Sequence, residues 1–333
     1  MPAPMKLALV LFAFLVLPPA PAASQQFPPD DEVQTLVQTR VDNGGAKGIA
    51  LGLLEADGST RTFSAGTAGT GEADLTPSTL FEIGSITKVF TGTLLADMTR
   101  RGEVSLTDPV QTLLPDGVTM PERNGAEIKL VDLATHRSAL PRLPSNFAPA
   151  DPSDPYADYS AEMLYDFLSS YELTRDIGAE AEYSNLAVGL LGHVLAERVG
   201  MTYEEAVRSR ILDPLEMDMT TIELTAEQDE LMAKGHDPAG AVVPLWDVGT
   251  LAGAGGLRSN VTDMLRFLAA NVGEPSTEVE LALRDAHEAR VNMGESMDIG
   301  LNWITRTTDG QRTVWHNGGT GGFRTFVGFD PDA

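Results

Sequence analysis

The sequence contains no cysteine and has few positively charged residues. Of 333 residues, 23 are Lys or Arg and 48 are Asp or Glu, so the formal net charge is -25. Without thiols the protein forms no disulfides and has neither thiol catalysis nor cysteine-bound metals. The acidic charge argues against a basic surface for nucleic acid or for anionic lipid headgroups. We expect a soluble, acidic protein that does not bind nucleic acid.

Long apolar runs are also missing, except at the N-terminus. There Lys6 precedes the apolar segment Leu7–Leu17, and the small residues Ala20 and Ala22 follow it. These three zones are typical of a secretory signal peptide, which we place at residues 1–22. No later segment is long enough to span a membrane, and no cysteine follows the run to carry a lipid. The pattern predicts a periplasmic or secreted protein without a membrane anchor.

Length and composition set the size of the fold. With 42% hydrophobic residues, the chain can bury the core of one large domain or of two interlocked lobes. Helical spacing of apolar residues, strand-like content and turn signals divide the chain into elements. The expected helices are 33–41, 85–102, 185–199 and 261–271, and the expected strands are 48–54, 61–66, 312–316 and 325–329.

The order of these elements predicts the fold class. Strands occur near both chain ends, while residues 108–245 are mostly helical stretches separated by loops rich in Pro, Gly and Asp. We expect an α/β fold with one antiparallel sheet built from both chain ends and flanked by helices, plus a mostly helical lobe at about residues 108–245. One domain would span residues 30–333. The sequence stops at the turn signal Asp330–Ala333, so we expect that a C-terminal strand and helix are truncated.

Ser85 and Lys88 form the only Ser-x-x-Lys pattern, in a chain with five lysines. Residues three apart share a helix face, so the amine can take the proton of a hydroxyl that is otherwise a poor nucleophile. A lysine acts as a base only when burial or neighbouring positive charge lowers its pKa. Gly84 allows a tight start to this helix. The pair indicates a nucleophile beside its base, although a surface helix carrying both residues would show the same pattern.

Tyr183 and Asn185 lie at the start of the expected helix 185–199. Residues two apart in an extended segment point the same way, so both side chains could face one cleft. A tyrosine whose pKa is lowered by a nearby ammonium can shuttle a proton, and an asparagine amide can bind a substrate carbonyl. Structural packing or helix capping would also explain this pair.

His316 and the glycines that follow it close a predicted strand. Gly318 and Gly319 would let a substrate backbone approach closely, and a bare amide can donate a hydrogen bond to an oxyanion. We place the oxyanion hole at the backbone amides of Ser85 and Gly319. A satisfied core histidine and a glycine bulge in a hairpin are the structural alternatives.

These three motifs, in this order, resemble those of a known family. Ser85-x-x-Lys88, Tyr183-x-Asn185 and His316-x-Gly318 are similar to the motifs of the serine β-lactamase and penicillin-recognising hydrolases, specifically the class C branch. The resemblance covers residues 33–330 and includes four further segments, Leu133–Pro141, Ile211–Met217, Gly253–Ser259 and Trp315–Phe323.

The resemblance implies a role for each motif residue. Ser85 would be the nucleophile, Lys88 its base, and Tyr183 the general acid and base for deacylation. Asn185 would be a ligand of the substrate amide. The implied fold is a sheet flanked by helices beside a helical lobe.

The third motif departs from that of dedicated class C β-lactamases. His316 stands where those enzymes have a lysine. Related proteins that have a histidine at this place include DD-carboxypeptidases, D-amino-acid peptidases and esterases. His316, Gly318 and Gly319 would bind substrate. Ala139 stands where glycine is common in the family, which would reshape the nearby loop.

The combined pattern predicts a monomeric, exported serine hydrolase that forms an acyl-enzyme on amide or ester carbonyls, without metal or cofactor. β-Lactams are the first substrate class, and a D-Ala-type peptide or a small ester is the rival. A non-catalytic penicillin-binding sensor of the same fold would lack a catalytic residue, and none is missing. An α/β-hydrolase needs Gly-x-Ser-x-Gly and a zinc amidase needs His-Glu-x-x-His, and the sequence has neither.

Overall fold

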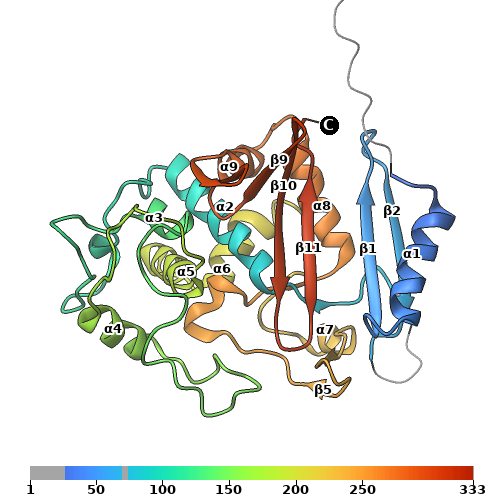
Figure 1. Cartoon of the computed structure of the whole chain (residues 1–333), viewed down its shortest axis with the longest axis horizontal. Helices are drawn as coiled ribbons and strands as arrows, with labels where there is room; N and C mark the ends of the chain where they lie inside the picture. Colours follow the sequence, from blue (N-terminus) through green and yellow to red (C-terminus); the bar gives the residue numbers. More distant parts are fainter. Residues whose placement is uncertain (1–26, 70–73, 333) are drawn as a thin grey trace, which may run out of the picture.

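The computed structural model in Figure 1 describes residues 27–69 and 74–332, so the expected signal peptide at residues 1–22 lies outside the described residues. The α-helices of this part are α1 (Asp30–Asp42), α2 (Thr87–Arg100), α3 (Leu130–Ala134), α4 (Ala161–Ser170), α5 (Asn185–Val199), α6 (Tyr203–Val207), α7 (Ala226–Glu230), α8 (Val261–Val272) and α9 (Glu278–His287). Its short irregular helices are η1 (Gly84–Ile86), η2 (Val110–Leu113), η3 (Arg208–Leu212) and η4 (Gly249–Ala254). Within the described ranges, we find no helix with the length and apolar character needed to cross a membrane.

The strands of the same residues are β1 (Gly48–Leu54), β2 (Thr60–Gly66), β3 (Phe81–Glu82), β4 (Gly235–His236), β5 (Val242–Val243), β6 (Arg258–Ser259), β7 (Val291–Gly294), β8 (Met297–Ile299), β9 (Ile304–Thr308), β10 (Gln311–Gly319) and β11 (Arg324–Phe329).

The N-terminal helix and hairpin, drawn in blue in Figure 1, pack as one unit. β1 and β2 pair antiparallel, with Leu51 opposite Phe63. Val33 and Val37 of α1 pack against Ala65 of β2. The sequence predicts this helix and this hairpin, and the structure confirms both.

The C-terminal strands form a second, five-stranded antiparallel sheet in the order β11-β10-β9-β8-β7. The predicted fold class, in which antiparallel strands from both chain ends are flanked by helices, is confirmed. One detail differs. In the described part of the chain β1 pairs only with β2 and β11 only with β10, so the two chain ends build two sheets instead of one.

Helix α8 explains why the sheets stay separate. It contacts both β1 and β11, and Figure 1 shows it beside the two strands. Gly52 of β1 faces this helix, since a Cβ at that position would lie 2.7 Å from Val261 Cγ1 and 2.9 Å from Leu265 Cγ. The two sheets therefore meet through the side chains of a helix, not through backbone hydrogen bonds between strands.

Helices α3 to α7 lie in the stretch that the sequence predicts to be mostly helical. The bounds of α5 agree with the prediction, because Ser184 accepts a hydrogen bond from the Ala187 backbone N–H at its start and Gly200 takes a φ of +69° at its end. The same stretch also contains the short antiparallel pair β4–β5, which the sequence does not predict.

The central helix α2 is buried along nearly its whole length. Phe90 stacks on Phe267 of α8 with 4.3 Å between ring centroids, and Phe267 stacks on Trp303 at 6.1 Å. Gly92 lets the chain after β8 approach closely, because a Cβ at this position would collide with the Leu301 carbonyl oxygen. Such dense packing resists movement. The N-terminal half of α2 is therefore held in place by α8 and by the chain after β8.

Candidate active site

The nucleophile candidate sits in the turn that leads into α2. β3 pairs with β6 just before this turn, and η1 then continues into the helix. Gly84 has a φ of +52°, and a Cβ there would lie 2.7 Å from the backbone nitrogen of Gly319. Only glycine meets both demands without strain. The tight start of the helix predicted at Gly84 is confirmed, and it places Ser85 at the surface of a cleft.

Lys88 lies one helical turn further, fully buried beneath Ser85. Its Nζ is 3.1 Å from Ser85 Oγ and donates a hydrogen bond of 2.6 Å to the Ala254 carbonyl oxygen. Burial, and then the positive charge of Arg142, holds the pKa of Lys88 well below its usual value. This is the direction of shift that a lysine base requires. Burial favours the neutral form of the amine, which can take the proton of the Ser85 hydroxyl.

Tyr183 reaches the same place from the loop before α5. Its ring centroid lies 5.0 Å from Lys88 Nζ and 5.1 Å from the guanidinium carbon of Arg142. Burial raises the pKa of the phenol, although a hydrogen bond with Ser85 and the charge of Arg142 oppose this rise. The lowered pKa that would help Tyr183 to shuttle a proton is therefore not found. Burial of the phenol outweighs the opposing contributions, so Tyr183 stays protonated at neutral pH.

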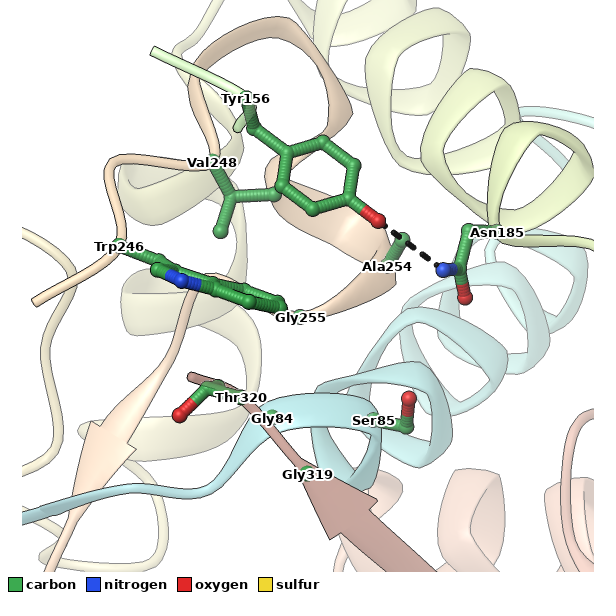
Figure 2. A pocket seen from close by; sticks show the side chains of 10 residues that line it. All are labelled: Gly84, Ser85, Tyr156, Asn185, Trp246, Val248, Ala254, Gly255, Gly319 and Thr320. Carbon is green, nitrogen blue, oxygen red and sulfur yellow. Dashed lines mark hydrogen bonds between the residues drawn. The ribbon is translucent and has the colours of Figure 1, made fainter. Parts of the chain in front are cut away.

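Asn185, the first residue of α5, lines the cleft together with Ser85 (Figure 2). Its Nδ2 donates a hydrogen bond of 3.1 Å to the Tyr156 hydroxyl. The cleft has a volume of about 270 Å³. Its lining is formed by Gly84, Ser85, Tyr156, Asn185, Trp246, Val248, Ala254, Gly255, Gly319 and Thr320.

The third predicted motif is divided between the cleft and the core. Gly319 lines the cleft, whereas Gly318 and His316 are buried. A Cβ at Gly318 would collide with the Ile83 carbonyl oxygen, so this glycine lets β10 dock against the nucleophile turn. His316 Nδ1 lies 2.7 Å from the Asn317 carbonyl oxygen, and burial lowers the pKa of His316 to about 3. His316 thus faces Tyr183 and Lys88 as a neutral ring.

Several cleft residues are missing from the sequence-based prediction. Tyr156 and Trp246 form an aromatic wall with 5.5 Å between ring centroids, opposite the nucleophile turn (Figure 2). Trp246 is fixed by its indole N–H, which donates to the Ser153 carbonyl oxygen, and by its backbone N–H, which donates to Glu82. Both aromatic residues lie in loops without periodic apolar residues, so local patterns carry no signal for them.

The fold and this cleft are those of a serine hydrolase, in which the candidate nucleophile Ser85 and the candidate base Lys88 lie one helical turn apart. The family model described as Beta-lactamase matches residues 33–333, and the chain belongs to this family. This family agrees with the resemblance found in the three sequence motifs.

Similar proteins fall into two activity groups. The chain is 31% identical to the D-alanyl-D-alanine-carboxypeptidase/endopeptidase AmpH of Escherichia coli K12 over 304 residues, which cover 86% of this chain and 77% of AmpH. It is 27% identical to a beta-lactamase of the same strain over 348 residues, which cover 93% of this chain and 87% of that protein.

Solved structures agree with both groups. A beta-lactamase/D-alanine carboxypeptidase from Pseudomonas syringae superposes with a TM-score of 0.76 at 25% identity, over 90% of this chain and 91% of that one. The class C beta-lactamase from Rhodobacter sphaeroides gives 0.75 at 25% identity, over 88% of each chain. The protein is an enzyme, a serine hydrolase of the β-lactamase type.

Proposed function

We propose that the protein hydrolyses β-lactams through an acyl-enzyme formed on Ser85. The observation that carries this proposal is the buried amine of Lys88, which lies 3.1 Å from Ser85 Oγ and whose pKa is held well below its usual value by burial. A serine hydroxyl needs an adjacent base to attack a carbonyl at neutral pH. Lys88 can meet this need because burial favours its deprotonated form.

The acylation step uses the three central side chains in turn. Ser85 Oγ attacks the carbonyl carbon, and its proton passes to Lys88 Nζ. As the C–N bond breaks, the leaving nitrogen takes the phenol proton of Tyr183, which regains one from the Lys88 ammonium. The backbone amides of Ser85 and Gly319, both of which line the cleft, donate hydrogen bonds to the oxyanion.

Deacylation reverses the direction of proton flow. Water attacks the ester carbon and gives a proton to the Tyr183 oxygen, while the phenol proton moves to Lys88. Lys88 then returns a proton to Ser85 Oγ as the acyl–oxygen bond breaks. Because burial raises the pKa of Tyr183, its oxygen accepts the proton of water only as its own proton leaves. The position of the phenol between Ser85 and Lys88 therefore controls this step.

A second candidate function is carboxypeptidase activity on peptides that end in D-alanine. It is favoured by His316, which is buried and neutral and so offers no cation at the place of the lysine of dedicated class C β-lactamases. It also fits AmpH, which is named a D-alanyl-D-alanine-carboxypeptidase/endopeptidase. A small ester would use the same cleft and the same acyl-enzyme.

We also propose that the protein is exported to the periplasm or the medium and acts as a monomer, with residues 30–333 as one domain. The N-terminal pattern supports export, with cleavage after Ala22. N-terminal sequencing of the protein from a bacterial host and light scattering test these points. A chain that keeps residue 1, or the mass of a dimer, would contradict them.

The activity is tested by supplying the purified protein with a chromogenic cephalosporin, a nitrophenyl ester and a D-Ala-D-Ala peptide. Mass spectrometry then locates the acyl group. We expect an adduct on Ser85, and Ser85→Ala should lower turnover by several powers of ten, on the order of the loss when a hydrolase nucleophile is removed.

Three outcomes separate the candidates. Turnover of the cephalosporin supports the β-lactamase function, and turnover of the peptide alone supports the carboxypeptidase. Turnover of the ester alone refutes both. Ser78→Ala, which changes an exposed serine before β3, is the matched control and should retain full activity.

A further inference from the structure

His136 contacts the chain on both sides of Tyr183, and it takes no part in the proton transfers proposed for Ser85, Lys88 and Tyr183. It lies just after α3 and is 2% exposed. The Glu182 backbone N–H donates a hydrogen bond of 2.8 Å to the His136 carbonyl oxygen, and the Ser184 backbone N–H donates one of 3.2 Å to His136 Nδ1. The rings of His136 and Tyr183 lie 4.6 Å apart between centroids. One residue thus binds the chain before and after Tyr183 and packs against its ring.

We propose that His136 is a positioning residue, which holds the Tyr183 phenol against Ser85 and thereby supports deacylation. This inference rests on the proposed acyl-enzyme function. It assigns to His136 no contact with substrate, only the placement of the group that moves the proton.

The Tyr183 loop needs such support because it has no regular structure of its own. Residues 171–184, between α4 and α5, contain neither helix nor strand. Two further hydrogen bonds fix the chain earlier and later in the sequence than Tyr183. Gly178 N–H donates to the Arg137 carbonyl oxygen, and Asn185 N–H donates to that of Arg142. Among these anchors, the two bonds to His136 are the ones adjacent to Tyr183. The phenol position therefore depends on the His136 contacts more than on the fold of the loop.

The chemical state of His136 suits this role. Because Nδ1 accepts the Ser184 N–H, the single proton of the neutral ring sits on Nε2. Burial is the main cause that lowers the pKa of His136 to about 3, and the nearby Lys88, His316 and Arg142 act in the same direction. Nδ1 therefore keeps its lone pair at neutral pH. A protonated ring would turn an N–H toward the Ser184 N–H and release the loop.

The backbone conformation of His136 also supports this role. Its φ is +57°, a left-handed conformation that residues with a Cβ adopt rarely and at a cost. Such strain persists where the surroundings fix it and often marks functional sites. Here the strained conformation lets the carbonyl oxygen and the ring of one residue face the backbone N–H groups of Glu182 and Ser184, on either side of Tyr183.

A nitrophenyl ester isolates the step that His136 would support. Its leaving group departs without a proton, so acylation does not need Tyr183, whereas deacylation does. We expect His136→Ala to release one equivalent of nitrophenol in a burst at near the wild-type rate. Steady-state turnover should then fall roughly tenfold to a hundredfold, the loss expected when a catalytic group is misplaced by about an ångström. Mass spectrometry should show the acyl group trapped on Ser85.

Two further variants separate positioning from general damage. His136→Asn keeps an acceptor at the place of Nδ1 and tolerates positive φ, so it should recover most of the turnover. His287→Ala removes another buried histidine, at the end of α9, and should leave the burst and steady-state rates unchanged. If His136→Ala does not fold, His136→Gly, which relieves the positive φ, takes its place.

The double variant with Tyr183→Phe gives the decisive comparison. If His136 acts through Tyr183, removing His136 in the Tyr183→Phe background slows deacylation no further. Additive losses, equal slowing of acylation and deacylation, or unchanged turnover in His136→Ala would each overturn the inference. Absence of any adduct on wild-type Ser85 would instead refute the proposed function.

Discussion

The two walls of the cleft are built in different ways. One wall is η1 and α2, a continuous buried segment that carries Ser85 and Lys88 three residues apart. The other wall comes from loops, which bring Tyr156 and Trp246 together from positions far apart in sequence, and a further loop brings Tyr183 to Lys88. The proposed nucleophile and base are therefore fixed by local helix geometry, whereas the proposed proton donor and substrate contacts depend on long-range hydrogen bonds. Damage to the first wall should stop the reaction, and damage to the second should slow or redirect it.

The largest effect is expected in the helical wall, for Lys88→Met. This change removes the base and fills its buried site with an apolar chain of similar length. The rate of Ser85 acylation should fall roughly a hundredfold to ten-thousandfold, the usual contribution of a general base. Stopped-flow mixing with a chromogenic cephalosporin or a nitrophenyl ester measures this rate.

Lys129→Met is the control, because Lys129 is an exposed lysine before α3. It should acylate at the wild-type rate. If Lys88→Met were acylated as fast as the control, the helical wall would not contain the base, and the comparison between the walls would fail.

The difference between the two walls also explains which parts of the site could be predicted from the sequence. Ser85, Lys88 and α5 were predictable because spacing along a helix fixes which residues share a face. Gly319 was placed correctly in the cleft, while Gly318 lies where β10 docks against the nucleophile turn, and sequence alone did not separate these two uses of glycine.

The loop wall was less predictable because its contacts join distant segments. His136 falls inside the segment Leu133–Pro141 that resembles the family, yet no local rule says that its ring packs on a residue 47 positions later, from 136 to 183. The direction of the Tyr183 pKa shift was not predictable for the same reason. It depends mainly on burial of the phenol, which only the assembled site determines.

A second effect, of intermediate size, is expected at His316 of β10, in the stability of the protein in acid. The pKa of His316 is about 3 in the folded chain because of burial and the nearby Lys88, against 6.5 for the free side chain. Between these values the unfolded state binds the extra proton, so the free energy of unfolding falls as pH falls from 6.5 toward 3. His316→Asn, which keeps a donor for the Asn317 carbonyl oxygen, should reduce this dependence by about 1.4 kcal/mol per pH unit.

Urea unfolding of wild type and His316→Asn from about pH 4.5 to about pH 8.5, a range that spans the ordinary pKa of histidine, checks this expectation. The two curves should run parallel above about pH 7, where the ring is neutral in both states, and separate as the solution becomes acidic. Parallel curves over the whole range would show that His316 takes up its proton in the folded protein, and the buried, neutral ring would then be wrong.

The smallest effect is expected at the far end of the loop wall, for Tyr156→Phe. The Tyr156 hydroxyl accepts a hydrogen bond from Asn185 Nδ2 and is the only protein group bonded to that amide nitrogen in the described chain. A single such bond contributes about 0.5–1.5 kcal/mol, which corresponds to a roughly twofold to tenfold change in an equilibrium. Because the ring stays in place and only the orientation of Asn185 is loosened, KM should rise by this factor while kcat changes little. Steady-state kinetics with a β-lactam that has an acylamide side chain measures both constants.

Tyr165→Phe is the matched control, since Tyr165 bonds His193 on α5 and does not line the cleft. A fall in kcat equal to that of Lys88→Met would place Tyr156 in the chemical step and remove the distinction between the two walls.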